Sequence, residues 1–288
     1  MPAMLIKGSE ISKQIKEELK IEIANLKTNN NLIPGLATVL VGENEASKVY
    51  VGAKEKACKE LGIYSERIDL PGDTKEGDLL ALIGRLNKDP KIHGILVQLP
   101  LPKHINETNV LYSIDPSKDV DGFHPVNVGK MMLGEPCFLP CTPHGILELL
   151  RRSNTELSGA EVVVVGRSNI VGKPVANMLL QKNGGNATVT VCHTGTRDIP
   201  SHTRRADILI VAVGKPKAVT ADMVKEGAVV IDVGVNRLDT GLVGDVDFEP
   251  VKEKARAITP VPGGVGPMTI VMLMKNTVQS AKMHEGLS

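Results

Sequence analysis

Aromatic side chains are scarce in this sequence, which has no tryptophan, three tyrosines and three phenylalanines among 288 residues. The formal net charge is only +1, and no basic stripe runs along the chain. Proteins that bind nucleic acids usually present a clustered basic surface, often with aromatic side chains on which bases stack. The composition therefore argues against a nucleic-acid partner.

Long hydrophobic runs are also missing, since no stretch approaches the roughly 20 apolar residues that cross a membrane. The first ten residues contain neither a long apolar run nor a basic presequence. We therefore expect a cytoplasmic protein without a membrane partner.

Cysteine is sparse as well, with four residues at 58, 137, 141 and 192. Their scattered positions give no disulfide framework, and Cys137 and Cys141 have no second Cys/His pair nearby. We expect reduced thiols and no metal site.

The most informative stretch that is present runs from residue 162 to residue 174. It begins with four consecutive valines, which are typical of a strand buried on both faces of a parallel sheet. A turn follows at Gly166, and Pro174 suits the first turn of a helix because its φ is already fixed. A strand, a glycine turn and a helix start in this order form the phosphate-binding turn of a Rossmann fold.

This turn departs from the usual G-x-G-x-x-G pattern. Gly166 fills the first position, Ser168 the second and Val171 the third, and Gly172 lies one position later. The pattern alone is only moderately specific, and an ordinary strand-to-helix turn is the alternative.

The next predicted strand, residues 188–192, favours NADP over NAD. NAD sites usually place an acidic residue at the end of this strand to bind the ribose hydroxyls, but none occurs between Arg167 and Arg197. The strand is followed instead by His193 and Thr194, which can donate hydrogen bonds. Because a guanidinium suits a dianionic phosphate, we predict an NADP site with its ribose phosphate near Arg167 and Thr194.

The order of the predicted elements indicates an α/β fold with two domains, each built on a parallel sheet. The predicted strands are 36–41, 65–70, 94–99, 162–165, 188–192, 207–212, 229–233 and 257–260. The main predicted helices are 9–27, 47–61 with Ser47 as its cap, 75–87, 143–152 and 268–284. We predict an N-terminal domain of residues 1–142, a Rossmann domain of 143–267, and a last helix, 268–288, that returns to the first domain because the second sheet is already complete.

Two side chains on the predicted helix 47–61 form one candidate pair. Tyr50 and Lys54 are four residues apart and share a face. Lys54 lies at the edge of a predicted core stripe that begins at Val49, where desolvation can lower its pKa. Alternatively, Lys54 is a solvated lysine beside Lys56 and Lys59.

Three polar residues, at the end of the predicted strand 94–99 and in a loop after it, are candidates for binding a ligand. Gln98 lies where ligands bind in open α/β sheets, and it either fixes an ammonium or a substrate amide, or satisfies loop backbone. Asp119 and Asp121 lie in a glycine-containing loop. They could bind a hard cation, Asp121 could bind a heterocycle rich in N–H groups, or either could stabilise a turn.

Together, five stretches resemble the bifunctional methylene-tetrahydrofolate dehydrogenase/methenyl-tetrahydrofolate cyclohydrolase family, in order and over nearly the whole chain. They are SKVYVGAK (47–54), HGILVQLPLP (93–102), KDVDG (118–122), GRS with VGKP (166–168 and 171–174), and TPVPGGVGPMT (259–269).

The resemblance implies an NADP-linked enzyme of one-carbon metabolism and purine biosynthesis, usually a homodimer, that binds a tetrahydrofolate between its domains. It would oxidise methylene-tetrahydrofolate to methenyl-tetrahydrofolate and hydrolyse that product to formyl-tetrahydrofolate. Carried over by position, Lys54 would be the catalytic lysine and Gln98 would tune it. Tyr50 would stack on the pterin, and Asp121 would hold the donor edge of the pterin.

The resemblance also assigns binding residues in the second half of the chain. Pro262 and Gly264 would line the folate side. The residues at the cofactor would be Gly166, Arg167, Ser168, Thr194 and Val235. Three alternatives stay open: an NADP oxidoreductase of the amino-acid-dehydrogenase type, a non-catalytic nucleotide-binding regulator, and a family member with only one activity.

Overall fold

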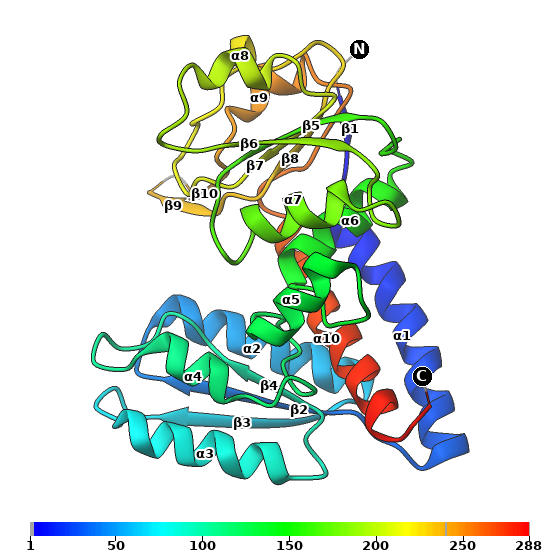
Figure 1. Ribbon diagram of the computed structural model, residues 1–288, viewed down its shortest axis with the longest axis vertical. Coiled ribbons are helices and arrows are strands. Elements are labelled where there is room, and N and C mark those ends of the chain that lie inside the picture. Colours follow the sequence, from blue (N-terminus) through cyan, green and yellow to red (C-terminus); the bar gives the residue numbers. More distant parts are fainter. Residues whose placement is uncertain (1–2, 240, 288) are drawn as a thin grey trace. The chain divides into compact units, whose positions relative to one another are not determined.

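The computed structural model describes residues 3–239 and 241–287, which form two compact units (Figure 1). The chain up to Lys13 and Thr142–Thr269 form the six-stranded unit, and Gln14–Cys141 with the chain from Ile270 on form the three-stranded unit. Each unit is built on a parallel sheet, so the predicted two-domain α/β fold is confirmed.

The three-stranded unit has its sheet in the order β3-β2-β4, with both pairings parallel. The central strand is buried over its whole length, because it has a neighbour on each side and covered faces. Its strands are β2 (Gly35–Val41), β3 (Tyr64–Leu70) and β4 (Gly94–Val97). Its helices are α2 (Glu45–Leu61), α3 (Glu76–Lys88), α4 (Glu107–Ser113), α5 (Pro125–Leu133) and most of α1 (Gly8–Asn30).

One face of this sheet is covered by α3. Leu79, Ile83 and Leu86 recur at helical spacing and pack in one buried cluster with side chains of β2 and β4. Burying each such side chain contributes about 1.5–3 kcal/mol, which fixes the sheet against this helix.

The last helix, α10 (Val265–His284, red in Figure 1), supplies the rest of the three-stranded unit. Asn276 donates hydrogen bonds to the carbonyls of Val120 and Leu139, and Lys282 forms an ion pair with Glu22 of α1. The prediction that the last helix returns to the first domain is therefore confirmed.

The six-stranded unit has a fully parallel sheet in the order β1-β11-β8-β7-β5-β6. The valine run forms β5, which lies between two strands and is buried from residue 162 to residue 165. The strands are β1 (Met4–Leu5), β5 (Glu161–Val165), β6 (Thr188–Cys192), β7 (Ile208–Val211), β8 (Val229–Asp232) and β11 (Ala257–Ile258), with a hairpin of β9 (Asn236–Leu238) and β10 (Gly241–Val243). The helical elements are α6 (Cys141–Arg152), α7 (Gly172–Leu180), α8 (Ile199–Thr203), the 3₁₀ turn η1 (Ala221–Met223) and α9 (Phe248–Lys252).

Several local expectations were wrong. Strand β1 pairs with β11, so the second sheet was not complete without the N-terminal residues. Asn44, not Ser47, caps α2, because its side chain accepts from the Ser47 N–H. Val49 is 70% exposed and lies outside the core.

No helix among the described residues is long and apolar enough to cross a membrane.

Candidate functional site

Lys54 and Gln98 are joined in the three-stranded unit. Lys54, on α2, donates from Nζ to Oε1 of Gln98 at 2.8 Å, and Gln98 is the first residue after β4. The amide nitrogen of Gln98 donates to the Leu99 carbonyl at 2.6 Å. Gln98 therefore holds the lysine and satisfies loop backbone at once, which were the two roles that the sequence left open.

The surroundings of Lys54 favour its neutral form. Burial lowers the pKa of Lys54, and the negative charge of Asp121 opposes that shift. Lys56 and Lys59, by contrast, are exposed. The alternative of a solvated lysine in a charged surface row therefore does not describe Lys54.

Asp119 and Asp121 have different surroundings. The carboxylate of Asp119 accepts backbone N–H bonds from Gly122 and Phe123, both at 3.2 Å, and from His124 at 2.8 Å. Its second oxygen also accepts from the Asn127 side chain at 2.8 Å. Asp119 therefore stabilises the turn.

Asp121 is the carboxylate that interacts with Lys54. Burial raises the pKa of Asp121, and the charge of Lys54 and the nearby Cys141 thiol oppose the rise. Among the described residues, no three His, Cys, Asp or Glu side chains are grouped to hold a metal ion. The carboxylate of Asp121 can accept hydrogen bonds, and its charge interacts with the amine of Lys54.

Cys141 is a member of this cluster that the sequence reasoning missed. It is 1% exposed, and its Sγ–H donates to the Val120 carbonyl at 3.4 Å. Burial raises the pKa of the Cys141 thiol well above its ordinary value, so the thiol is neutral. No spacing signal could have found it, since it lies 20 residues after Asp121 along the chain.

Tyr50 lies one turn before Lys54 on α2 and is 44% exposed. A half-exposed ring can accept a planar group on its face. This is compatible with the expected pterin stacking, which stays a prediction.

The glycine turn after β5 is built on two close approaches in the six-stranded unit. Gly166 has φ +125°, and a Cβ there would lie 2.2 Å from the Ala212 carbonyl oxygen. A Cβ on Gly172 would lie 2.2 Å from the Gly166 carbonyl oxygen. Gly172, not Val171, thus provides the close contact between helix and strand.

Ser168 replaces the middle glycine of the pattern and closes the turn with its side chain. Its Oγ accepts from the N–H groups of Val171 at 3.1 Å and Gly172 at 3.4 Å. The hydroxyl hydrogen can still point outward toward an anion.

A pocket of about 520 Å³ lies over this turn. Four of the five predicted cofactor residues, Gly166, Arg167, Ser168 and Thr194, line it. Val235 is not among its lining residues and is 49% exposed. The lining also includes His193 and Lys215, which the resemblance does not assign to the cofactor.

Arg167 and His193 make this pocket suitable for an anion. His193 Nδ1 accepts from the Gly195 N–H at 3.0 Å, which leaves the proton of a neutral ring on Nε2. This Nε2 lies 3.5 Å from Nη1 of Arg167, which is also a donor. Two donors that face each other favour an acceptor between or beside them, and a phosphate group fits.

Pro262 and Gly264 belong to the six-stranded unit, whereas Tyr50, Lys54 and Gln98 belong to the three-stranded unit. Pro262 is exposed and follows a cis peptide bond, and Gly264 is buried. Their predicted contact with folate stays a prediction.

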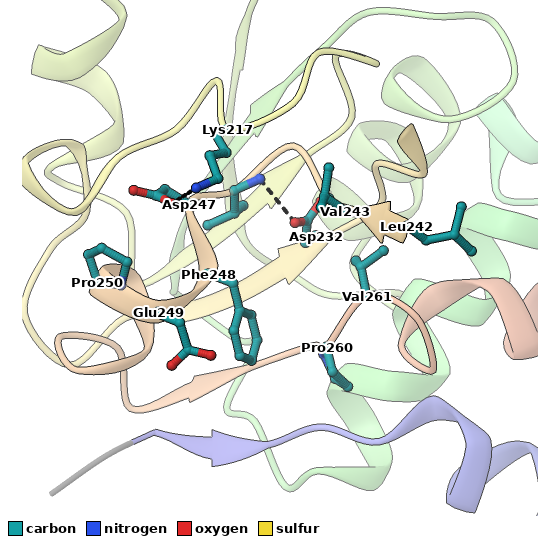
Figure 2. Close-up of a pocket in the computed structure, with 12 residues that line it drawn as sticks. Lys217, Asp232, Leu242, Val243, Asp247, Phe248, Glu249, Pro250, Pro260 and Val261 are labelled. Atoms are coloured by element: carbon teal, nitrogen blue, oxygen red, sulfur yellow. Dashed lines mark hydrogen bonds and ion pairs between the residues drawn. The ribbon is translucent and has the colours of Figure 1, made fainter. Parts of the chain in front are cut away.

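A second cavity of the six-stranded unit, about 460 Å³ in volume, shares no lining residue with the first (Figure 2). Lys217 points toward Asp247 and forms an ion pair with it at 3.0 Å, and Asp232 accepts from the Val246 N–H at 3.0 Å. Its remaining walls include Phe248 and Pro260. Because these charged groups are directed at one another or at backbone, and Glu249 forms an ion pair with Lys252 at 3.7 Å, we assign no ligand to it.

Comparisons with known proteins cover the whole chain. Two family models match: the catalytic domain of tetrahydrofolate dehydrogenase/cyclohydrolase at residues 6–121, and the NAD(P)-binding domain of the same enzyme at 140–285. A relative from Syntrophus aciditrophicus, named bifunctional protein FolD, is 66% identical over 100% of both chains.

Two solved structures agree with this match. The bifunctional FolD enzyme of Campylobacter jejuni is 53% identical with a TM-score of 0.95, over 98% of this chain and 99% of that one. The Trypanosoma brucei enzyme, solved with NADP and an inhibitor, is 40% identical with a TM-score of 0.94, over 99% of each chain.

We expect Gly166→Ala to destabilise the six-stranded unit by at least about 2 kcal/mol, because the new methyl group meets a backbone carbonyl and the φ is strained. Thermal unfolding measures the loss. The control is Gly129→Ala on α5, where a Cβ meets open space and a small stabilisation is expected. Equal Tm values for the two variants would contradict the close approach.

Proposed function

The chain belongs to the tetrahydrofolate dehydrogenase/cyclohydrolase family, and we propose that it is a bifunctional one-carbon enzyme acting on tetrahydrofolates. It oxidises methylene-tetrahydrofolate with NADP and hydrolyses the methenyl product to formyl-tetrahydrofolate. The observation that carries the proposal is the half-buried Lys54, with a lowered pKa and a hydrogen bond to Gln98.

The oxidation needs positioning more than a strong base. Loss of hydride from the one-carbon bridge leaves a cation that the adjacent nitrogen stabilises, and NADP held at the pocket of Arg167 and Thr194 would supply the hydride acceptor. Tyr50 stacks on the pterin, and Asp121 accepts hydrogen bonds from its N–H edge. The exposed ring of Tyr50 and the placement of Asp121 beside Lys54 support these roles.

The hydrolysis needs proton transfers. Water adds to the cationic carbon and releases one proton to solvent, and the ring opens as the second proton moves from the added oxygen to the leaving nitrogen. Lys54 in its neutral form accepts this second proton and delivers it to the nitrogen. Gln98 directs the amine toward the substrate, since its Oε1 accepts one of the Nζ hydrogens.

The preference for NADP rests on the charge of the cofactor pocket. Among the described residues that line it are Arg167, His193 and Lys215, and no Asp or Glu. A pocket that provides donors without a carboxylate suits a ribose phosphate better than free ribose hydroxyls.

The assembly and setting follow from the resemblance alone. We propose that the N-terminal domain binds folate, that the 143–267 domain binds NADP, and that the enzyme works as a homodimer. Light scattering tests the last point, because a mass of 30.8 kDa would indicate a monomer. Cytoplasmic location and a supply of formyl groups to purine biosynthesis stay predictions.

The decisive assay mixes the purified protein with methylene-tetrahydrofolate and NADP, then with NAD, and follows reduced nicotinamide and methenyl-tetrahydrofolate separately. We expect reduced NADP with little methenyl build-up. Accumulation of methenyl-tetrahydrofolate would mean a dehydrogenase with weak cyclohydrolase activity. No reduction with either cofactor would refute the proposed function.

Lys54→Met should lower the cyclohydrolase rate by about 10²-fold or more, because it removes the proton-transfer group while keeping the length of the side chain. Methenyl-tetrahydrofolate should then accumulate in the same assay, and NADP affinity should stay unchanged. Lys56→Met, at an exposed neighbouring position, is the matched control. Full cyclohydrolase activity in the Lys54 variant would show that this lysine has another role.

The cyclohydrolase rate should rise with pH as Lys54 loses its proton, with a midpoint below the ordinary lysine value of 10.5. The carboxylate of Asp121 holds the pKa of Lys54 up, so Asp121→Asn should move this limb to lower pH. The pH–rate profile at saturating substrate measures both. If the rise occurs at the same pH in the variant, the charge of Asp121 does not affect the pKa of Lys54.

Arg167→Gln should raise the KM for NADP by about 10- to 100-fold and leave the KM for NAD nearly unchanged, because a charged hydrogen bond to the ribose phosphate is lost. Steady-state kinetics with both cofactors measure the split. Lys173→Gln is the control, since Lys173 is exposed in the same turn, bonds Asn169 and does not line the pocket. A parallel loss with NAD would place Arg167 elsewhere on the cofactor.

A further inference from the structure

We propose that Asn276, on the last helix, is a positioning residue for the site formed by Lys54 and Asp121. It acts through two backbone segments that its side chain joins. The inference rests on the proposed function only for the role of Asp121 in binding the pterin.

Asn276 is almost completely buried, with 1% of its surface exposed. Its Nδ2 donates to the Val120 carbonyl at 2.8 Å and to the Leu139 carbonyl at 2.9 Å, and it lies 3.8 Å from the Cys141 sulfur. Both hydrogens of the amide nitrogen are therefore used on carbonyls of segments that are distant in the sequence.

These two carbonyls adjoin the reactive cluster. Val120 immediately precedes Asp121, and Leu139 lies two residues before Cys141. The Val120 carbonyl also accepts from the thiol of Cys141 at 3.4 Å, so both of its lone pairs are occupied. The amide and the thiol together fix the backbone immediately before Asp121, whose charge interacts with Lys54.

A second contact from the same helix holds the other end of this loop. Ser280, one turn after Asn276, places its Oγ 2.8 Å from the Ser117 carbonyl and 2.5 Å from the His93 carbonyl. The loop is thus held at residues 117 and 120, and Asp119 is turned toward backbone N–H groups. These contacts fix the backbone on the N-terminal side of Asp121. Such outer contacts determine how accurately a binding side chain is held.

Thr277, on the same helix, is also buried, but its side chain forms its hydrogen bond within α10. Thr277 is 0% exposed, and its Oγ1 donates to the Leu273 carbonyl one turn back. Loss of that hydroxyl tests burial in α10 without disturbing the segment of Asp121.

The experiment compares Asn276→Leu, Asn276→Ser and Thr277→Val in the full chain. In Asn276→Leu, we expect the KM for methylene-tetrahydrofolate to rise and the cyclohydrolase kcat to fall, each by about tenfold. The Kd for NADP should stay within about twofold. Asn276→Ser keeps one donor in a smaller side chain, so its losses should be smaller, and it serves if the leucine variant does not fold. Thr277→Val should match the wild type in all three quantities.

A further readout separates positioning from loss of structure. If Asp121 moves away from Lys54, the pH limb of the cyclohydrolase reaction shifts to lower pH in the Asn276 variants and stays in place in Thr277→Val. Unchanged folate kinetics and pH limb in a folded Asn276 variant would overturn the inference. So would equal losses in the Thr277 variant, or a parallel loss of NADP affinity.

Failure of the proposed function gives a different result, because the wild-type protein would then lack turnover. Calorimetric binding of tetrahydrofolate is measured for the same proteins for this reason. About tenfold weaker binding in Asn276→Leu would support the positioning role without any turnover. Absence of binding in the wild type would overturn both proposals.

Discussion

Parallel pairing of the strands is the constraint on which both units depend, because it brings the carboxyl ends of neighbouring strands to one edge of each sheet. In the six-stranded unit, the glycine turn follows β5, His193 follows β6, and Lys215 comes shortly after β7. In the three-stranded unit, Gln98 follows β4. These polar groups therefore come from loops whose positions the strand pairings already determine, whereas Tyr50 and Lys54 come from α2.

Within the three-stranded unit, side chains of the same chemical type have different tasks. Asp119 and Asp121 differ in role because they have different partners. Asp119 accepts four N–H bonds from its own loop and helix, while Asp121 interacts with the amine of Lys54. The partner of Lys54, Gln98 at the end of β4, is a neutral amide. A carboxylate at this position would strongly stabilise the ammonium form of Lys54. Gln98 instead orients Nζ through a hydrogen bond, and burial lowers the pKa of the lysine.

The sequence predicted features that depend on neighbouring residues in the chain. The valine run became β5, and the glycine turn formed where the pattern placed it. Lys54 and Gln98 were candidates from their positions, the family resemblance joined them in one role, and the structure brings them to 2.8 Å. Contacts between distant residues gave no such signal. Cys141 and Asn276 look like ordinary core positions in the sequence, and β1 is too short at two residues to show a periodicity.

The returning helix has a consequence for how the protein is synthesised. The carbonyls of Val120 and Leu139 have their amide partner at residue 276, so this part of the three-stranded unit cannot reach its final hydrogen bonding until that residue has left the ribosome. The six-stranded unit has the opposite dependence, because β1 is synthesised well before β11, the strand with which it pairs. Neither unit can therefore complete its fold early in translation. A nascent or prematurely terminated chain has no assembled site, so it cannot form and then release the reactive one-carbon intermediate.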